Sequence, residues 1–259
     1  MHKSHENYYE LIWMLAKTDF KLRYHGSVLG YFWALLKPLL MFAILNFVFS
    51  SVFADRIAGG EYYSLQLLVA ILMFNFFSEG TNAGMQSLLS KSQLVTKIYI
   101  PRWTIIFAST VNSAMIYIMN LLVVVVFFVW KQFLPSPEAV MMFIVSSLLI
   151  YVIIISFSLF TAPLYVKFRD LSMIWEVLIQ ILFYATPVFY ALQLMPLSIQ
   201  QVLLLNPMAF IIHFTKESLI NNHFPELWQG GTFFVLIIIV FFLSTLSYRK
   251  LSLRIAEEI

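Results

Sequence analysis

The chain has 259 residues, of which 61% are hydrophobic and 11% are charged, and its mean hydropathy is +0.85. Soluble domains carry roughly 45–50% apolar and about 25% charged residues, so this composition excludes a soluble fold, which would lack the polar side chains to cover its surface. The chain has no cysteine, which excludes disulfides and thiol chemistry, and no long basic stripe outside the apolar segments to suggest a nucleic-acid partner.

The first expected element is an amphipathic helix within the cytoplasmic segment 1–33. Met1 to Glu10 is polar and mixed in charge, so we expect no signal peptide and a cytoplasmic N-terminus. Between Tyr8 and Tyr24 one broad side of the helix is apolar and the other is charged. This pattern is typical of a helix that lies in the membrane interface. Gly26 and Gly30 are expected to turn the chain into the membrane.

Six apolar stretches follow, and each is long enough to cross a ~30 Å hydrocarbon core as a helix. Helices are required because lipid offers no partner for backbone polar groups, and the strict alternation of a barrel strand is absent. The predicted fold is therefore an all-α membrane protein that forms one domain over residues 1–259, with a six-span core at 35–247 and a cytoplasmic tail at 248–259. The predicted spans are Leu35–Phe53, Tyr63–Gly84, Thr104–Val129, Ala139–Val166, Leu171–Phe189 and Thr232–Ser247.

The positions of Lys and Arg predict that both termini are cytoplasmic. With that orientation only Arg56, Lys131 and Lys216 of the 16 cations lie outside. A seventh span at Ser198–Ile220 would export the basic tail, which argues against it. The cations expected inside are Lys3, Lys17, Lys21, Arg23, Lys37, Lys91, Lys97, Arg102, Lys167, Arg169, Arg249, Lys250 and Arg254.

The outer segment Pro187–Gln229 is more apolar than a typical loop and contains two short helical pieces, at about Ser198–Leu205 and Met208–Ile220. Neither piece is long enough to cross the membrane. Two interpretations remain open from the residues alone, a pair of re-entrant half-helices or a pair of helices lying on the outer surface. Broken backbone at membrane depth requires protein or a water-filled cavity around it.

The cytoplasmic connection Gln86–Arg102 is amphipathic and ends at Pro101. It is interpreted as a short helix that docks to a cytoplasmic partner or as an interfacial anchor. The chain has no phosphate-binding glycine loop and no His-Glu-x-x-His pattern. We therefore expect no nucleotide site, no catalysis, no cofactor and no metal site in this chain.

Two carboxylates, Glu79 and Glu176, fall inside predicted spans. An intramembrane carboxylate is a candidate for proton coupling or substrate contact. Both lie near the cytoplasmic ends of their helices, where water can reach them, and Lys167 and Arg169 are candidate structural partners of Glu176. The small polar residues around Glu79 are also typical of a helix–helix contact.

Aromatic residues form 17% of the chain, with 26 Phe, which exceeds the needs of the interfacial belts. Some are candidates to line a pathway, because sugar rings stack their C–H faces on aromatic rings, although lipid-facing packing accounts for many of them. The candidate channel and gate residues are Phe42, Asn46, Phe49, Phe53, Phe183, Tyr184, Phe189, Tyr190 and Asn206.

Four stretches, in order along the chain, resemble the permease subunits of polysaccharide-export ABC transporters, which serve O-antigen, capsule or teichoic acid export. The first is Asp19-Phe-Lys-Leu-Arg-Tyr-His-Gly-Ser-Val-Leu-Gly-Tyr-Phe-Trp-Ala-Leu-Leu-Lys-Pro38. The others are Leu94–Arg102, Phe168–Leu171, and Thr186–Tyr190 followed by Asn206-Pro207. Together they cover nearly the whole chain.

The resemblance implies a homodimer in the bacterial inner membrane that pairs with two copies of a separate ATPase, which uses ATP and Mg. A lipid-linked glycan would enter from the cytoplasmic leaflet. By the same resemblance, Ser87–Lys97 would be the coupling helix that docks to the ATPase, and the half-helices before the last span would be a re-entrant outer gate. The candidate ATPase-docking residues are Leu88, Leu89, Lys91, Leu94, Val95 and Lys97.

Alternative functions are export of teichoic acid, capsule, lipid or a drug within the same superfamily, and proton-coupled secondary transport through Glu79 or Glu176. The absence of a visible internal repeat argues against the secondary transporter. A membrane-embedded glycan enzyme would need paired carboxylates or a metal cluster, and neither is present in the sequence.

Overall fold

The computed structural model describes residues 7–53, 60–97 and 100–252, without the side chains of residues 96 and 97. In this part of the chain all regular structure is helical. The α-helices are α1 (Tyr8–Tyr24), α2 (Trp33–Phe53), α3 (Tyr63–Ser90), α4 (Ser92–Lys97), α5 (Arg102–Trp130), α6 (Pro137–Lys167), α7 (Leu171–Ala185), α8 (Leu197–Leu204), α9 (Pro207–Asn221) and α10 (Leu227–Leu251). Short 3₁₀ turns occupy Gly30–Phe32, Gly60–Tyr62 and Leu192–Leu194.

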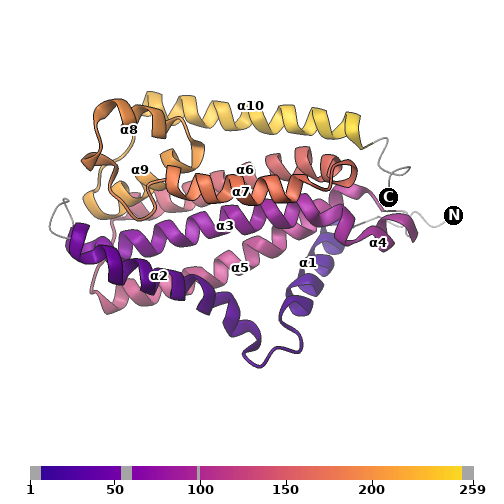
Figure 1. The fold of residues 1–259 in the computed structure, drawn as a ribbon, viewed down its shortest axis with the longest axis horizontal. Helices are drawn as coiled ribbons and strands as arrows, with labels where there is room; N and C mark the ends of the chain where they lie inside the picture. The colour runs from indigo at the N-terminus through magenta and orange to yellow at the C-terminus, as the bar shows by residue number, and fades with distance from the viewer. Residues whose placement is uncertain (1–6, 54–59, 98–99, 253–259) are drawn as a thin grey trace.

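Five helices, α2, α3, α5, α6 and α10, are long and apolar enough to cross a membrane. The shorter α7 is also apolar, and α8 and α9 form a pair bent by 111°. In Figure 1 the long helices and α7 run lengthwise through one elongated bundle. The predicted all-helical, multi-pass fold is confirmed.

The bundle has two distinct ends (Figure 1). At the first, called the α4 end, α3 passes into α4 and α10 finishes, and the Arg102 guanidinium donates a hydrogen bond to the Ser252 carbonyl. At the other, called the α9 end, lie α8, α9 and the start of α3, and α9 packs against α3. These ends correspond to the predicted cytoplasmic and outer sides respectively.

Helix α3 is the centre of the bundle and packs against α2, α5, α6, α7 and α9. Its apolar segment is 78% buried, against 11–28% for the other four long spans, whose exposed apolar faces suit lipid. Two glycines allow α6 to approach closely. A Cβ at Gly84 would lie 1.9 Å from Ser158 Oγ, and one at Gly80 would lie 2.7 Å from Ile154 Cδ1. This is the small-residue contact expected for membrane helices.

The fifth predicted span, Leu171–Phe189, is helical only to Ala185, and this is a correction. Pro187 disfavours helical backbone at the residue before it, and Thr186 is extended, with φ −107° and ψ 134°. The 15-residue helix is about 22 Å long, which is shorter than the ~30 Å hydrocarbon core. The helix alone is therefore too short to cross that core, and irregular backbone follows it.

That irregular backbone is satisfied by side chains from distant helices. Lys216 Nζ, on α9, donates to the Pro187 carbonyl at 2.5 Å and to the Tyr190 carbonyl at 3.3 Å. The Tyr63 hydroxyl, at the start of α3, donates to the Phe189 carbonyl at 2.6 Å. Non-helical backbone at membrane depth is tolerated where protein surrounds it in this way.

The two predicted half-helices are present, but they differ in their surroundings. Helix α9 begins at Asn206, whose Oδ1 accepts a hydrogen bond from the Met208 amide at 3.0 Å, and Pro207 suits the first helical position. Most of α9 is buried against α3 and α6. Helix α8 contains no buried residue. Helix α9 is therefore embedded in the bundle, whereas α8 lies on its outside, and the re-entrant arrangement stays a prediction.

The predicted N-terminal amphipathic helix is α1, which packs against α5. Ala16 is fully buried, and the Tyr8 ring contacts Trp103 edge to face at 5.6 Å. Lys17 and Lys21 are exposed as expected, whereas Leu22, from the predicted apolar stripe, is 65% exposed. The face that meets the bundle is therefore narrower than the sequence pattern indicates.

Candidate functional site

A cavity of about 490 Å³ lies between α1 and α2 on one side and α3 and α5 on the other. It extends from the junction of α1 with α3 toward the middle of the bundle. Glu79 and Leu72, both in its lining, are about 10 Å apart along the α3 axis. The lining residues are Arg23, Tyr24, Ser27, Trp33, Ala34, Lys37, Pro38, Leu40, Leu72, Asn75, Phe76, Glu79, Ser113, Ile116, Tyr117 and Asn120.

The rim of the cavity carries three charged groups. Arg23 Nη2 lies 3.0 Å from Glu79 Oε2, and Lys37 Nζ lies 3.7 Å from Glu79 Oε1. The Lys37 side chain is 77% exposed, and partly exposed ion pairs of this kind add little to stability. Two cations facing one carboxylate leave a net positive charge at the rim, which favours an anionic ligand.

Tyr24 stands beside this charged group. Burial raises the pKa of its phenol, the Arg23 charge opposes the shift, and the Glu79 charge adds to it. The Tyr24 hydroxyl therefore stays protonated at neutral pH and can donate a hydrogen bond at the rim.

Deeper in the cavity the wall is polar and aromatic. Asn120 Nδ2 donates to the Ile116 carbonyl at 3.0 Å, while its Oδ1 is buried and has no partner among the described residues. An unsatisfied buried acceptor costs about 1–3 kcal/mol, so a donor from water or a ligand would be stabilised there. The rings of Phe76 and Tyr117 are stacked at 4.3 Å, and the Tyr117 hydroxyl lies 2.9 Å from Ser147 Oγ.

Of the two predicted intramembrane carboxylates, the structure brings only Glu79 into this cavity. Glu176 is exposed on α7. It shares one stripe of that helix with Ser172, Gln180 and Tyr184, because residues four apart lie on the same face. Gln180 is also exposed, and Tyr184 is 68% exposed.

Most of the predicted channel aromatics gather near the α9 end, where they contact one another. Phe49 stacks on Phe189 at 4.9 Å, and Phe183 lies 5.2 Å from Phe74 of α3. The cluster consists of Phe49, Phe53, Phe183, Tyr184, Phe189 and Tyr190.

The other three predicted gate residues have local contacts. Phe42 is buried and meets Phe127 edge to face at 5.3 Å. Asn46 Oδ1 accepts a hydrogen bond from Ser64 at 2.8 Å, which joins α2 to α3. Asn206 caps α9, and its Nδ2 donates to Thr186 Oγ1 at 3.1 Å.

The predicted coupling segment is divided between two helices. Leu88 belongs to α3 and is fully buried, so its side chain offers no surface to a partner. Leu89, Leu94 and Val95 are partly buried, and Lys91 forms an ion pair with Asp19. Lys97 lies at the end of α4, but its side chain is outside the description, as are Ile98 and Tyr99.

Sequence reasoning missed most of the cavity, although two spacings signal it. Asn75 and Glu79 are four residues apart on α3, and Ser113, Tyr117 and Asn120 follow one face of α5. The sequence does not show that these faces of α3 and α5 meet residues of α1 and α2 around one cavity.

A helical bundle with several helices able to cross a membrane, an amphipathic helix packed beside it and a charged cavity between them is the fold of a multi-pass membrane protein. The sequence profile described as the ABC-2 type transporter matches residues 10–220, and the chain belongs to that family. It is 26% identical over 253 residues to the O-antigen export system permease protein RfbA of Klebsiella pneumoniae, covering 96% of this chain and 95% of that protein.

A second relative has a similar name. The chain is 26% identical over 227 residues to the O-antigen export system permease protein RfbA of Myxococcus xanthus, which covers 85% of this chain and 84% of that protein. The family resemblance expected from the four sequence stretches is therefore confirmed, and the chain is a transporter permease rather than an enzyme.

Proposed function

We propose that this chain is the channel-forming subunit of an ATP-driven exporter that moves a lipid-linked, O-antigen-like polysaccharide from the cytoplasm across the inner membrane. Family membership and the names of both relatives support the transport class. The observation that carries the substrate assignment is the cavity between α1, α2, α3 and α5, which combines a cationic rim with a polar and aromatic wall.

Each part of the cavity suits one part of such a substrate. The cations Arg23 and Lys37 favour a phosphate or pyrophosphate group. Trp33, which is 44% exposed, offers a ring face to a sugar, and the unpartnered Asn120 Oδ1 can accept a hydrogen bond from a sugar hydroxyl. A volume of about 490 Å³ is in the range of single-ligand pockets, so it suits the headgroup and first sugar rather than a polymer.

The distribution of cations supports the orientation. Lys91 links α3 to α4, Arg102 begins α5 beside the end of α10, and Arg249 and Lys250 lie in the last turn of α10, so these four cations belong to the α4 end. Arg23 and Lys37 pair with Glu79, which lies further along α3. Cytoplasmic loops are enriched in Lys and Arg. The α4 end and both termini would then be cytoplasmic, with the cavity opening toward the cytoplasmic leaflet.

Energy would come from a separate subunit, because the sequence contains no Walker A pattern. Two copies of an ATPase that uses ATP and Mg would dock at α4 and the last turn of α3. Of the predicted docking residues, Leu89, Lys91, Leu94 and Val95 are at least partly exposed there. Leu88 would contribute only by packing beneath them.

We further propose that two copies of the chain form the pathway. The exposed stripe of α7 carries Glu176 and Gln180, and polar groups facing lipid are costly. Covering that stripe with a second copy around a water-filled path would remove the cost. Tyr184, a predicted channel residue on the same stripe, would then place an aromatic ring in the path.

The substrate assignment is tested by Lys37→Gln, with Lys21→Gln as the matched control. Both lysines are exposed, so neither change disturbs the core, but only Lys37 lines the cavity. In cells that lack the native permease we expect Lys37→Gln to lower surface polysaccharide at least tenfold at normal membrane levels, and Lys21→Gln to have no effect. Equal export by the two variants would refute the role of the rim, and rescue of teichoic acid, capsule, lipid or drug export instead would reassign the substrate.

A further inference from the structure

Helix α1 is joined by two ion pairs to two different functional regions. Asp19 pairs with Lys91, in the single-residue link between α3 and α4. Arg23 pairs with Glu79 at 3.0 Å on the rim of the cavity. Because Asp19 and Arg23 are four residues apart, they lie on the same face of α1. One rigid helix therefore contacts both the docking segment and the cavity.

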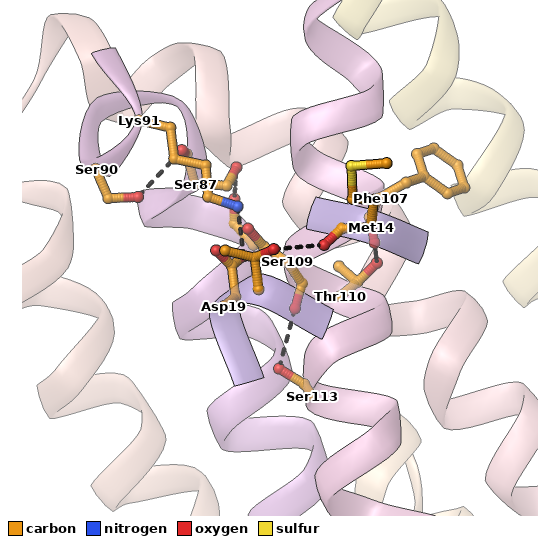
Figure 2. A network of polar contacts seen from close by, with 11 residues as sticks. Met14, Asp19, Ser87, Ser90, Lys91, Phe107, Ser109, Thr110 and Ser113 are labelled. Atoms are coloured by element: carbon orange, nitrogen blue, oxygen red, sulfur yellow. Dashed lines mark hydrogen bonds and ion pairs between the residues drawn. The ribbon is translucent and has the colours of Figure 1, made fainter. Parts of the chain in front are cut away.

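The Asp19–Lys91 pair is placed where it can control the direction of α4. The Lys91 carbonyl accepts hydrogen bonds from the amides of Leu94 at 2.9 Å and Val95 at 3.1 Å, so Lys91 begins that helix. Its side chain is only 14% exposed and that of Asp19 is 23% exposed. Figure 2 shows Asp19 and Lys91 facing each other between α1 and the end of α3.

Toward its end α3 is packed against α6 at Gly84, whereas α4 makes few contacts with the other described elements. The Ser87 hydroxyl donates to the Gly84 carbonyl at 2.6 Å, and the Ser90 hydroxyl donates to the Ser87 carbonyl at 3.1 Å (Figure 2). Gly84 in turn lies against Ser158 of α6. A displacement of Lys91 is therefore opposed by α3 but can be followed by α1 through Asp19.

We propose that α1 is a coupling lever, in which Asp19 and Arg23 are positioning residues that link movement of α4 to the charge state of the cavity rim. This inference rests on the proposed function, because it assumes that an ATPase moves α4. When α4 shifts, Lys91 draws Asp19 and α1 with it. Arg23 then separates from Glu79 and becomes free to bind the anionic group of the substrate. The start of α1, where Ala16 is buried and Tyr8 contacts Trp103 of α5, serves as the pivot, and the part that carries Asp19 and Arg23 tilts about it.

The first test uses the chain alone and requires no transport. Because the native sequence has no cysteine, Asn75→Cys places a single thiol in the cavity wall. We expect Asp19→Asn to change the rate at which a water-soluble maleimide labels this thiol at least threefold. The reversed pair Asp19→Lys with Lys91→Asp should restore the original rate, and Lys17→Gln, an exposed change on the same helix, should not alter it. Equal labelling rates in all four proteins would overturn the lever.

The second test uses the complex with its ATPase in liposomes. We expect Asp19→Asn to retain assembly and ATP hydrolysis within twofold while export per ATP falls at least tenfold, and we expect the reversed pair to recover most of that loss. A merely structural role would lower assembly and hydrolysis together, without recovery in the reversed pair, and would overturn the proposal. A wild-type chain that binds no ATPase would instead refute the proposed function, and the labelling test would still decide whether α1 controls the cavity.

Discussion

Replacing Gly84 with alanine tests whether the α3–α6 contact sets the packing of the bundle. A Cβ at this position would lie 1.9 Å from Ser158 Oγ and 2.5 Å from Ser158 Cβ, and 3.3 Å from Thr110 Cγ2. Rotation of the serine hydroxyl removes the first clash. It does not remove the second, because the α6 backbone fixes the position of Cβ. The two helices must therefore separate.

The change in the free energy of unfolding caused by Gly84→Ala is the sum of two opposing effects. Alanine is favoured over glycine in a helix interior by about 1 kcal/mol, and overpacking a tight core costs about 1–3 kcal/mol. The severity of the Ser158 contact places Gly84→Ala at the upper end, for a net loss of about 2 kcal/mol in the free energy of unfolding. For a chain of this size that lowers the Tm by about 4–8 °C.

Thermal unfolding of the purified protein in detergent measures this loss. Gly231→Ala on α10 is the matched control, since a Cβ there meets no atom within 4 Å, and we expect its Tm to be unchanged or slightly raised. Gly80→Ala should have an intermediate effect, because it meets the flexible end of Ile154. Combining Gly84→Ala with Ser158→Gly should recover part of the loss. A Tm for Gly84→Ala equal to wild type would refute the reasoning.

Three further changes test separate parts of the structure. Lys216→Met leaves two buried carbonyls without this donor, and each unsatisfied group costs about 1–3 kcal/mol. We therefore expect a lower Tm for Lys216→Met than for Lys131→Met, which changes an exposed lysine. Equal Tm values would show that Lys216 does not hold this backbone. In liposomes, export by the Glu79→Gln variant should still require ATP and should not be affected by a proton uncoupler. Loss of export when the proton gradient is collapsed would instead favour a secondary transporter. Leu94→Glu should retain the assembled complex but separate ATP hydrolysis from export, and unchanged export would show that α4 is only an interfacial anchor.

The long spans could be predicted from the sequence because their signals are local. The predicted span Ala139–Val166 corresponds to α6, which begins two residues earlier at Pro137. Ser136 caps it by accepting a hydrogen bond from the Ala139 amide at 3.3 Å. Apolar length and a capping serine before proline are both visible in the sequence. Such boundaries need no knowledge of the tertiary structure.

The end of α7 could not be predicted from apolar length alone. The sequence stays apolar through Phe189, so hydropathy extends the span past the residue where the helix stops. The donors that make this break tolerable, Tyr63 and Lys216, lie 126 and 29 residues from their acceptors at Phe189 and Pro187. Lys216 also counted as an outer cation in the charge distribution, whereas the structure buries it.

The amphipathic pattern of α1 also did not predict the ion pairs that this helix makes with the bundle. Hydrophobic periodicity assigns charged residues to the solvent side of a helix, yet Asp19 and Arg23 make ion pairs with the bundle. Their partners, Lys91 and Glu79, are 72 and 56 residues away. The pairing depends on how α1 crosses α3 and α5, and no local pattern specifies that crossing.

The uneven attachment of α2 accounts for both the cavity and the aromatic cluster. Near the α9 end, α2 is joined to its neighbours by Asn46, which bonds Ser64, and by Phe49, which stacks on Phe189. Near its start, Trp33 and Lys37 line the cavity, and Lys37 pairs with Glu79 of α3 across it. Phe49 and Phe53, two of the predicted channel aromatics, thus join the last turns of α2 to the irregular backbone after α7, and the charged rim lies near the other end of α2.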